Sequence, residues 1–441
     1  MTQKKSWKLN NKFIDFDTKN FKLIYLALIV GLVVGIVSSA FRIILSYIEI
    51  FRDHLYADAG KSGIISWIWP ILFAVIGISV SLFLVKKFAP ETSGSGVQEI
   101  EGTLDGIRPI RWKRVLPIKF FASLFSLGSG LLLGREGPTI QIGGNIGKMI
   151  KDIFREPDNE NNSLISAGAA AGLASAFNAP FAGIIFVIEE MHEHFKFNFY
   201  SVSAIIIASG TADFVVKALV NDNPVIRMTV FPSPNLSSLW LFIILGLLFS
   251  IVGFLYNKLL IVALNFFNKL SKVPIIFLGS TIGIIIVFIG IFFPDMIGGG
   301  YNTFTKVLDQ SFTFYALIIL FVIRMLLSAF SYGTGTPGGI FAPMLVLGII
   351  LGMLFGSAMQ HYFPTLVLHP GIFAVAGMAG IFAATVRAPL TGLMLAVEMT
   401  SNFELILPLI ITTVTASVFT ALLGNQPIYT TLLKRTLANT K

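Results

Sequence analysis

The sequence contains no cysteine and few charged residues. Without cysteine, the chain cannot form a disulfide framework, a thiol nucleophile or a cysteine metal site. Of its five histidines only His192 and His194 are close together, which is too small a set for a metal site. Charged residues make up 12% of the chain, against about 25% in soluble domains. We therefore expect no metal ion and no cofactor, and the composition excludes an ordinary soluble domain.

Long apolar runs make up much of the sequence. The chain of 441 residues is 55% hydrophobic, and its mean hydropathy is +0.81. Several runs reach the roughly 18–20 residues that a helix needs to cross a bilayer. They predict an all-α polytopic membrane protein surrounded by lipid. The runs are Leu23–Ile48, Ile64–Val85, Leu239–Leu264, Ile275–Phe293, Phe314–Phe330 and Leu405–Leu423.

Both ends of the chain are basic. Residues 1–22 form a lysine-rich arm, and the tail carries Lys434, Arg435 and Lys441. By the positive-inside rule both termini are predicted to be cytoplasmic, which implies an even number of crossings. The first apolar run is too long and starts too late for a cleavable signal peptide. The net charge of +9 is therefore attributed to topology and lipid contact, and no nucleic-acid partner is expected.

The stretch from Gly134 to Pro138 places a charged pair directly after an apolar run. Glycine before a helix and proline in its first turn are helix-start signals. A helix N-terminus inside an apolar protein offers free N–H groups, here including that of Gly137, and a positive dipole end to an anion. Glu136 adds a titratable carboxylate where an anion would bind. We expect anion handling coupled to protons, because acids within a membrane are functional by default. A structural pairing of Glu136 with Arg135 is the alternative.

A second uncharged stretch, Gly333–Pro343, lies between two apolar segments. It could be a surface loop, but irregular backbone at membrane depth survives only where it is buried or lines a cavity. The N–H groups of Ile340, Phe341 and Ala342 would open the next helix and form a second anion-binding terminus. Such dipoles hold a small anion without trapping it.

A third stretch, Ser93–Glu101, has the composition of a flexible Ser/Gly linker. Ser95 and Gln98, however, stand in capping-box spacing. The spacing predicts that Ser95 is the N-cap of a short helix.

The second half of the chain repeats landmarks of the first. Pro180 precedes Glu189 with the spacing by which Pro389 precedes Glu398. Upstream, Gly134-x-x-x-Pro138 is matched by Gly339-x-x-x-Pro343. This order predicts an internal duplication of the inverted-repeat kind found in transporters. The predicted parts are the arm 1–22, a first repeat 23–220, a linker 221–238 and a second repeat 239–441.

Taken together, the motifs resemble the CLC family of chloride channels and transporters along nearly the whole chain. The resemblance implies an inverted-repeat fold of many tilted and broken helices, and a homodimer with one pore per subunit. It also implies the inner membrane of a bacterial cell. The chain ends soon after its last helix, so CBS domains are not expected. The motifs are Gly94-Ser95-Gly96-Val97-Gln98, Gly134-Arg135-Glu136-Gly137-Pro138, Gly339-Ile340-Phe341-Ala342-Pro343 and Pro427-Ile428-Tyr429.

The resemblance also implies roles for individual residues. Ser95 and Tyr429 would donate hydroxyls to a central chloride, joined by the backbone amides of Ile340 and Phe341. Glu136 would be the gating glutamate, which leaves an anion position when it is protonated. Glu190 would be the internal glutamate that takes up protons from the cytoplasm, whereas Glu189 is interpreted as structural.

The first motif departs from the family at one position, where Gln98 stands in place of the usual proline. A proline in a first helical turn removes only an N–H that lacks a partner anyway. We expect a small local change and an effect on chloride affinity.

These features favour a secondary active antiporter that exchanges chloride for protons. A passive chloride channel of the same fold is the first alternative, and a sodium-coupled organic-solute transporter is the second. An enzyme is not expected, because the sequence shows no nucleophile–base or metal constellation.

Overall fold

The computed structural model describes residues 18–61, 63–156, 162–191, 198–222, 225–226, 228–309 and 311–438. Over these residues the regular structure is helical, and only isolated bridges join extended segments. Most of the predicted basic arm (residues 1–17), His192, His194 and Lys441 lie outside the described residues.

All six apolar runs are helices. They form α1 (Thr18–Lys61), α2 (Ile68–Phe88), α9 (Trp240–Lys269), α10 (Ile275–Phe292), α12 (Phe314–Gly333) and α16 (Ile406–Leu422). Two further helices, α8 (Phe199–Leu219) and α13 (Phe341–Tyr362), bring the described helices that are long and apolar enough to cross a membrane to eight. The protein is therefore a multi-pass membrane protein, as the runs predicted.

Shorter elements pack inside this frame. Every residue of α6 and α14 is buried. Small residues let the backbones approach: a Cβ at Gly143 would lie 2.0 Å from the carbonyl oxygen of Gly168. The shorter α-helices are α3 (Val97–Leu104), α4 (Trp112–Gly128), α5 (Glu136–Ile153), α6 (Ser163–Phe177), α7 (Pro180–Glu190), α11 (Tyr301–Leu308), α14 (Gly371–Val386), α15 (Pro389–Thr400) and α17 (Ile428–Ala438). The 3-10 turns are η1 (Ile64–Trp67), η2 (Pro90–Thr92), η4 (Leu236–Ser238), η5 (Pro294–Met296) and η6 (Phe403–Leu405).

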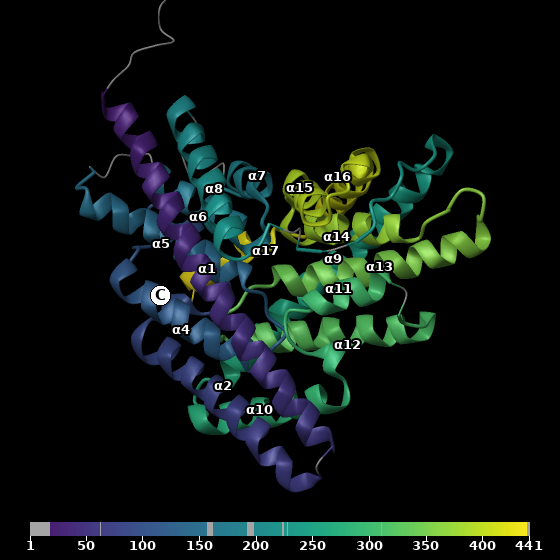
Figure 1. Ribbon diagram of the computed structural model, residues 1–441, viewed down its shortest axis with the longest axis horizontal. Helices are drawn as coiled ribbons and strands as arrows, with labels where there is room; N and C mark the ends of the chain where they lie inside the picture. Colours follow the sequence, from purple (N-terminus) through teal and green to yellow (C-terminus); the bar gives the residue numbers. More distant parts are fainter. Residues whose placement is uncertain are drawn as a thin grey trace, which may run out of the picture.

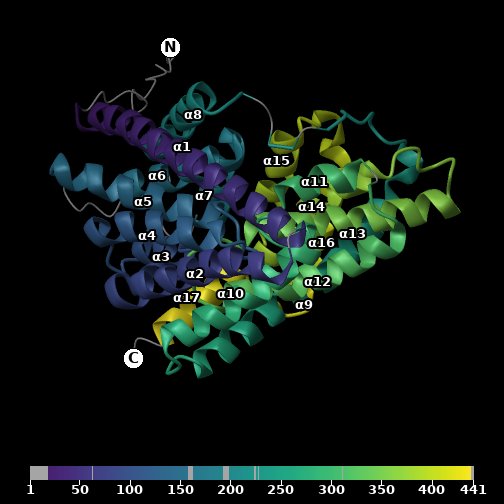
Figure 2. The same ribbon diagram turned by 60° about the horizontal axis from the view of Figure 1, so that its bottom comes forward.

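The helices fall into two sets with the same packing pattern. In the first set α5 packs on α6, α1 on α8, and α6 on both α7 and α8. In the second set α13 packs on α14, α9 on α16, and α14 on both α15 and α16. Figure 2 shows the first set, coloured purple to blue-green, beside the second set, coloured green to yellow. This recurrence supports the predicted duplication, with the linker 221–238 falling between α8 and α9.

Two helices tie the sets together. The long α1 runs obliquely across α4, α5, α6 and α8 (Figure 1) and also contacts α10 of the second set. The last helix, α17, returns to the first set and packs against α3. The C-terminal helix therefore lies beside a helix near the start of the chain.

Candidate anion and proton site

Three glycine-rich loops meet between the two sets of helices. The backbone groups of Gly134 and Gly339 exchange two hydrogen bonds of 2.7 Å each, and the N–H of Gly338 donates to the carbonyl of Gly94 at 3.0 Å. The three motifs that lie far apart in the sequence therefore form one hydrogen-bonded unit.

Helices begin at this unit, as the glycine and proline signals predicted. α5 begins at Glu136, and α13 begins at Phe341 with Ile340 as its N-cap. Gly137 lies against Ser95, because a Cβ at Gly137 would be 2.7 Å from the Cβ of Ser95. The starts of α3, α5 and α13 are thus adjacent. First-turn N–H groups have no intrahelical partner, so they concentrate positive potential here without a full charge.

Glu136 occupies the start of α13 with its own carboxylate. Its side chain is completely buried, and its Oε2 accepts a hydrogen bond of 3.4 Å from the N–H of Ala342. Its Oε1 accepts a hydrogen bond from the hydroxyl of Tyr301. The amide of Ala342, predicted to bind an anion, therefore contacts the Glu136 carboxylate in this conformation. A carboxylate stands where the helix terminus would attract a free anion.

Arg135 does not neutralise this carboxylate directly. Among the described residues no ion pair joins Arg135 to Glu136. The guanidinium lies over the ring of Tyr301, 4.5 Å from its centroid, and its Nη2 donates to the carbonyl of Ala176 at 3.3 Å. This geometry does not support the alternative in which Arg135 pairs with Glu136; instead, Arg135 holds the loop against Tyr301 and Ala176.

The prediction that Ser95 is a helix N-cap is wrong by one residue. The N-cap of α3 is Gly96, in a left-handed conformation with φ of 82°. The Oγ of Ser95 accepts from the N–H of Val97 at 3.2 Å and donates to the Oε1 of Gln98 at 3.0 Å. The left-handed turn, which favours glycine, moves Ser95 out of the helix. The Ser95 hydroxyl therefore donates its hydrogen bond to Gln98, whereas the resemblance implies that it donates to chloride.

Tyr429 carries an unpartnered hydroxyl in the protein interior. The side chain is fully buried, and its hydroxyl has no hydrogen-bond partner among the described residues. Its ring lies edge-on to that of Phe341, with 5.8 Å between centroids. Buried polar atoms are nearly always hydrogen-bonded, so an orphan of this kind indicates a missing ligand.

Tyr332, which the sequence analysis did not single out, connects the two hydroxyl residues. It is buried at the end of α12, hydrogen-bonds to Ser95 and interacts electrostatically with Tyr429. The one signal in the sequence is its position directly before the Gly333–Pro343 stretch. Tyr332 therefore belongs to the same polar cluster as Ser95.

Lys119 is a second residue that the sequence analysis passed over. It lies completely buried on α4, and its Nζ donates to the carbonyl of Thr92 at 3.0 Å and to that of Gly94 at 2.8 Å. Buried lysine needs such partners to keep its charge. These two bonds hold the loop before Ser95 in place.

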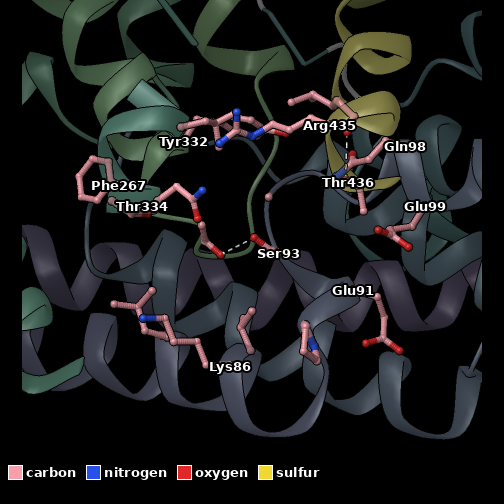
Figure 3. A pocket seen from close by; sticks show the side chains of 18 of the residues that line it. Lys86, Glu91, Ser93, Gln98, Glu99, Phe267, Tyr332, Thr334, Arg435 and Thr436 are labelled. Carbon is pink, nitrogen blue, oxygen red and sulfur yellow. Dashed lines mark hydrogen bonds between the residues drawn. The ribbon is translucent and has the colours of Figure 1, made fainter. Parts of the chain in front are cut away.

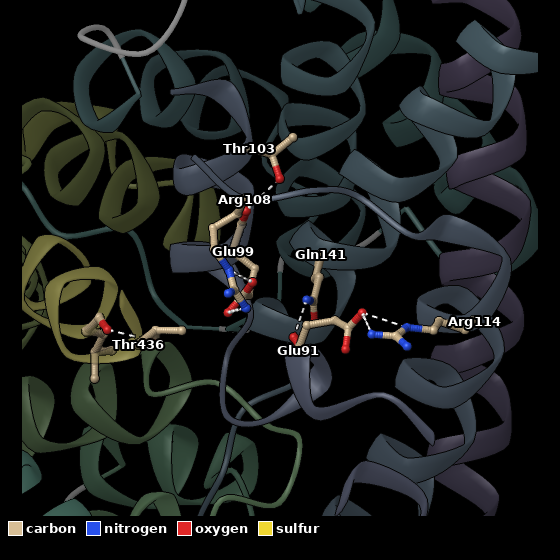
Figure 4. A network of polar contacts seen from close by, with 8 residues as sticks. Glu91, Glu99, Thr103, Arg108, Arg114, Gln141 and Thr436 are labelled. Atoms are coloured by element: carbon tan, nitrogen blue, oxygen red, sulfur yellow. Dashed lines mark hydrogen bonds and ion pairs between the residues drawn. The ribbon is translucent and has the colours of Figure 1, made fainter. Parts of the chain in front are cut away.

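An inner cavity of about 610 Å³ opens beside this cluster. Gly94 and Tyr332 line it, and its lining contains more cationic than acidic side chains. Figure 3 shows Tyr332, Lys86 and Arg435 around it. The two acids are already engaged, as Figure 4 shows: Glu99 accepts two hydrogen bonds from Arg108, at 2.9 and 3.2 Å, and Glu91 pairs with Arg114 at 2.6 Å. The remaining lining cations are Lys86, Arg111 and Arg435. The cavity is therefore electropositive and concentrates anions.

An outer cavity of about 560 Å³ lies on the other side of the loop unit. Tyr301 lines it, beside Glu49, Arg52 and Asp53. Both cavities touch α10, the inner one at Leu278 and the outer one at Gly290, which places them on the order of 18 Å apart along that helix. Glu136 and the Ser95 cluster therefore lie between two openings.

Glu190 ends α7 and is half-buried. It interacts electrostatically with Glu189, with Arg387 and with Glu101 of α3. Glu101 is 2% exposed, and one of its carboxylate oxygens has no hydrogen-bond partner among the described residues. Tyr429 interacts electrostatically with Glu101, Glu190 and Glu136 alike. Tyr429 therefore interacts with both Glu136 and Glu190, and Glu101 is a further buried acid in their surroundings.

The chain matches the family model for voltage gated chloride channels over residues 77–421. It belongs to this family. It is 45% identical over 436 residues to the H(+)/Cl(-) exchange transporter ClcA of Vibrio cholerae, and 43% identical over 435 residues to that of Vibrio parahaemolyticus. In each case the match covers 98% of this chain and 93% of the relative.

A solved structure of a slow cyanobacterial Cl-/H+ antiporter is also similar. It is 39% identical, with a TM-score of 0.92, and the match covers 95% of this chain and 98% of the antiporter. The predicted resemblance to the CLC family is confirmed, and with it the all-helical inverted-repeat fold.

Proposed function

We propose that this protein is an antiporter that exchanges chloride for protons across the inner membrane of a bacterial cell. The observation that carries the proposal is the Glu136 carboxylate at the N-terminus of α13, between an inner and an outer cavity. The exchange-transporter names of its relatives support the same function.

The proposed chloride site lies where the helix starts converge. The amides of Ile340 and Phe341 open α13, Gly137 opens the adjoining α5, and the orphan hydroxyl of Tyr429 points to a missing ligand. Ser95 completes the site when its hydroxyl turns from Gln98 to the anion. Dipoles and hydroxyls bind chloride without a full opposing charge, so the anion can leave again.

Coupling arises because an ionised Glu136 is itself an anion. It competes with chloride for the amide of Ala342 and neighbouring helix termini. Protonation removes its charge, frees the terminus and lets chloride pass. Glu190, half-buried at the end of α7, takes up protons from the cytoplasm; Tyr429 interacts with both acids, and Glu101 interacts with Glu190. Transport needs no covalent step and no cofactor.

The same proposal covers assembly and orientation. The protein forms a homodimer with one pore per subunit, and both termini face the cytoplasm. The basic tail residues Lys434 and Arg435 support that orientation by the positive-inside rule. Chloride and protons are the transported partners.

The experiment is a flux assay in liposomes that contain the purified protein. An outward chloride gradient with no pH gradient should drive protons inward against their resulting gradient, as recorded by a pH electrode. The zero-current voltage should shift with pH as well as with chloride. A voltage that stays at the chloride Nernst potential at every pH would identify a passive channel. Uptake that requires sodium would identify the organic-solute transporter.

A further inference from the structure

We propose that Tyr301 is a positioning residue for Glu136: its hydroxyl holds the ionised carboxylate at the start of α13 and thereby sets the pH at which anion transport begins. The inference rests on the gating role proposed for Glu136. The hydrogen bond from the Tyr301 hydroxyl to Oε1 is the observation behind it.

The internal duplication explains why a side chain from α11 reaches this point. α3 and α11 are both eight-residue helices that follow a left-handed glycine, Gly96 with φ of 82° and Gly300 with φ of 87°. Tyr301, the first residue of α11, is therefore the counterpart of Val97. The inner cavity is lined by the loop before α3, and the outer cavity is lined by the start of α11. Tyr301 thus stands between the outer cavity and Glu136.

The backbone before Tyr301 is held in place. The N–H of Gly298 donates to the carbonyl of Gly130 at 2.9 Å, in the loop that leads to Glu136. The buried guanidinium of Arg324 donates to the carbonyls of Asp295 and Gly298. A Cβ at Gly300 would collide with that guanidinium, at 2.3 Å from its Nη2. The segment that carries Tyr301 is therefore tied to the segment that carries Glu136.

The ring of Tyr301 is held on its face and at its edge. The Arg135 guanidinium lies 4.5 Å from the centroid, and the ring of Phe304 packs against it edge-on with 5.9 Å between centroids. These contacts involve the ring and leave the hydroxyl for Glu136. Replacing the tyrosine with phenylalanine therefore removes the hydrogen bond and keeps the packing.

The charged and titratable groups around the pair come from several elements. Arg135 belongs to the start of α5, Arg42 and Glu49 face the pair from α1, and Tyr429 faces it from α17. Among the described residues, the groups that donate to the carboxylate from other elements are the Tyr301 hydroxyl and the Ala342 N–H. Hydrogen bonds to ionised acceptors are stronger than those to neutral ones. The Tyr301 hydrogen bond therefore stabilises the ionised Glu136 side chain at the start of α13. It stabilises less the protonated side chain, which in the proposed mechanism has moved away from that position.

The test is the pH profile of chloride efflux from liposomes. With Tyr301→Phe, protonation of Glu136 should need less acid, so the activation midpoint should move upward by about one pH unit, a tenfold change in proton affinity. Efflux at neutral pH should rise accordingly. Tyr256→Phe is the control, because it also removes an interior tyrosine hydroxyl, one that bonds to Ser328 rather than to Glu136. An unshifted midpoint in Tyr301→Phe, or an equal shift in the control, would overturn the inference.

The variant Glu136→Gln tests the gating role of Glu136 separately from the positioning role of Tyr301. If Glu136 is the gate, Glu136→Gln gives a flat profile, and adding Tyr301→Phe leaves that profile flat. A profile that still titrates in Glu136→Gln would refute the gate itself. A flat profile in Glu136→Gln with no shift in Tyr301→Phe would refute only the role of Tyr301.

A second measurement does not depend on transport. The infrared carbonyl band of protonated Glu136, identified by its loss in Glu136→Gln, can be titrated in detergent. Its midpoint should move upward in Tyr301→Phe by the same amount. A band midpoint equal to that of the unmodified protein would contradict the inference even if the variant transports poorly.

Discussion

Glu189 and Glu398 each cap the helix that carries the other. The Glu189 carboxylate, on α7, accepts hydrogen bonds from the N–H groups of Leu390 and Thr391, at 2.9 and 2.7 Å, at the start of α15. The Glu398 carboxylate, on α15, accepts from the N–H groups of Phe181 and Ala182, at 3.1 and 2.7 Å, at the start of α7. The duplicated Pro-to-Glu spacing thus produces a reciprocal pair.

This pairing gives two intramembrane acids a structural explanation. Each carboxylate meets the positive end of a helix dipole and satisfies N–H groups that have no partner within their own helix. It agrees with the interpretation of Glu189 as structural. The adjacent Glu190 takes no part in this pair of caps.

Glu189→Gln should lower the stability of the protein and leave the coupling of chloride to proton transport intact. An amide keeps one acceptor oxygen but loses the charge, so we expect a loss of about 1–2 kcal/mol of stability. The midpoint of thermal unfolding in detergent, followed by tryptophan fluorescence, should fall. Glu398→Gln should also lower the unfolding midpoint, but by less, because Glu189 accepts a further hydrogen bond from the Thr391 hydroxyl. A loss of proton transport in Glu189→Gln with unchanged thermal stability would show that Glu189 works on the proton route.

Glu136→Ala should separate chloride movement from proton movement. Removing the carboxylate leaves the Ala342 amide and its neighbours open to chloride at every pH, so chloride should pass passively. Proton flux driven by a chloride gradient should fall to the background of empty liposomes. Protons still driven uphill by chloride through this variant would rule out the gating role.

Glu190→Val should stop proton transport and spare chloride flux. Glu190 is the half-buried acid that interacts with Glu101 and Tyr429, whereas the proposed chloride site is the helix-start cluster. Parallel recordings of proton and chloride flux in one liposome preparation provide the measurement, and Glu189→Gln is the matched control one residue away. Unchanged proton pumping in Glu190→Val would remove Glu190 from the mechanism.

Gln98→Ala should increase chloride affinity. In the structure the Ser95 hydroxyl donates to the Gln98 side chain, and losing that acceptor leaves the hydroxyl free for an anion. A gain of about 1 kcal/mol, the typical net value of one hydrogen bond, corresponds to roughly fivefold tighter binding. Calorimetric titration of the detergent-solubilised protein measures it. In a Ser95→Ala background the Gln98 substitution should have no effect, and a gain there would place the cause elsewhere.

The long helices could be predicted from the sequence because they depend on local composition. A run such as Leu239–Leu264 has few structural options in lipid, since every backbone group must be satisfied within the helix. α8 was passed over because serine, threonine and Asp213 interrupt its apolar residues. The starts of α5 and α13 followed from glycine and proline, which act within a few residues.

The one-residue error at Ser95 has a different origin. Capping-box spacing describes a helix that begins in a free chain, but Gly96 adopts a left-handed turn packed against Gln141. A Cβ there would lie 2.1 Å from the Gln141 side-chain oxygen. The partner belongs to α5, and nothing within α3 reveals it.

By itself, the sequence determined that this protein is a helical membrane protein, that helices start at Glu136 and Phe341, and that its halves are duplicated. Apolar length, glycine and proline act locally, so their effects can be read along the chain. Only the tertiary structure decided that Tyr301 donates to Glu136, that Tyr332 joins Ser95, and that Glu189 and Glu398 exchange caps. These contacts join residues from 165 to 237 positions apart, and which side chains meet depends on how all the helices pack.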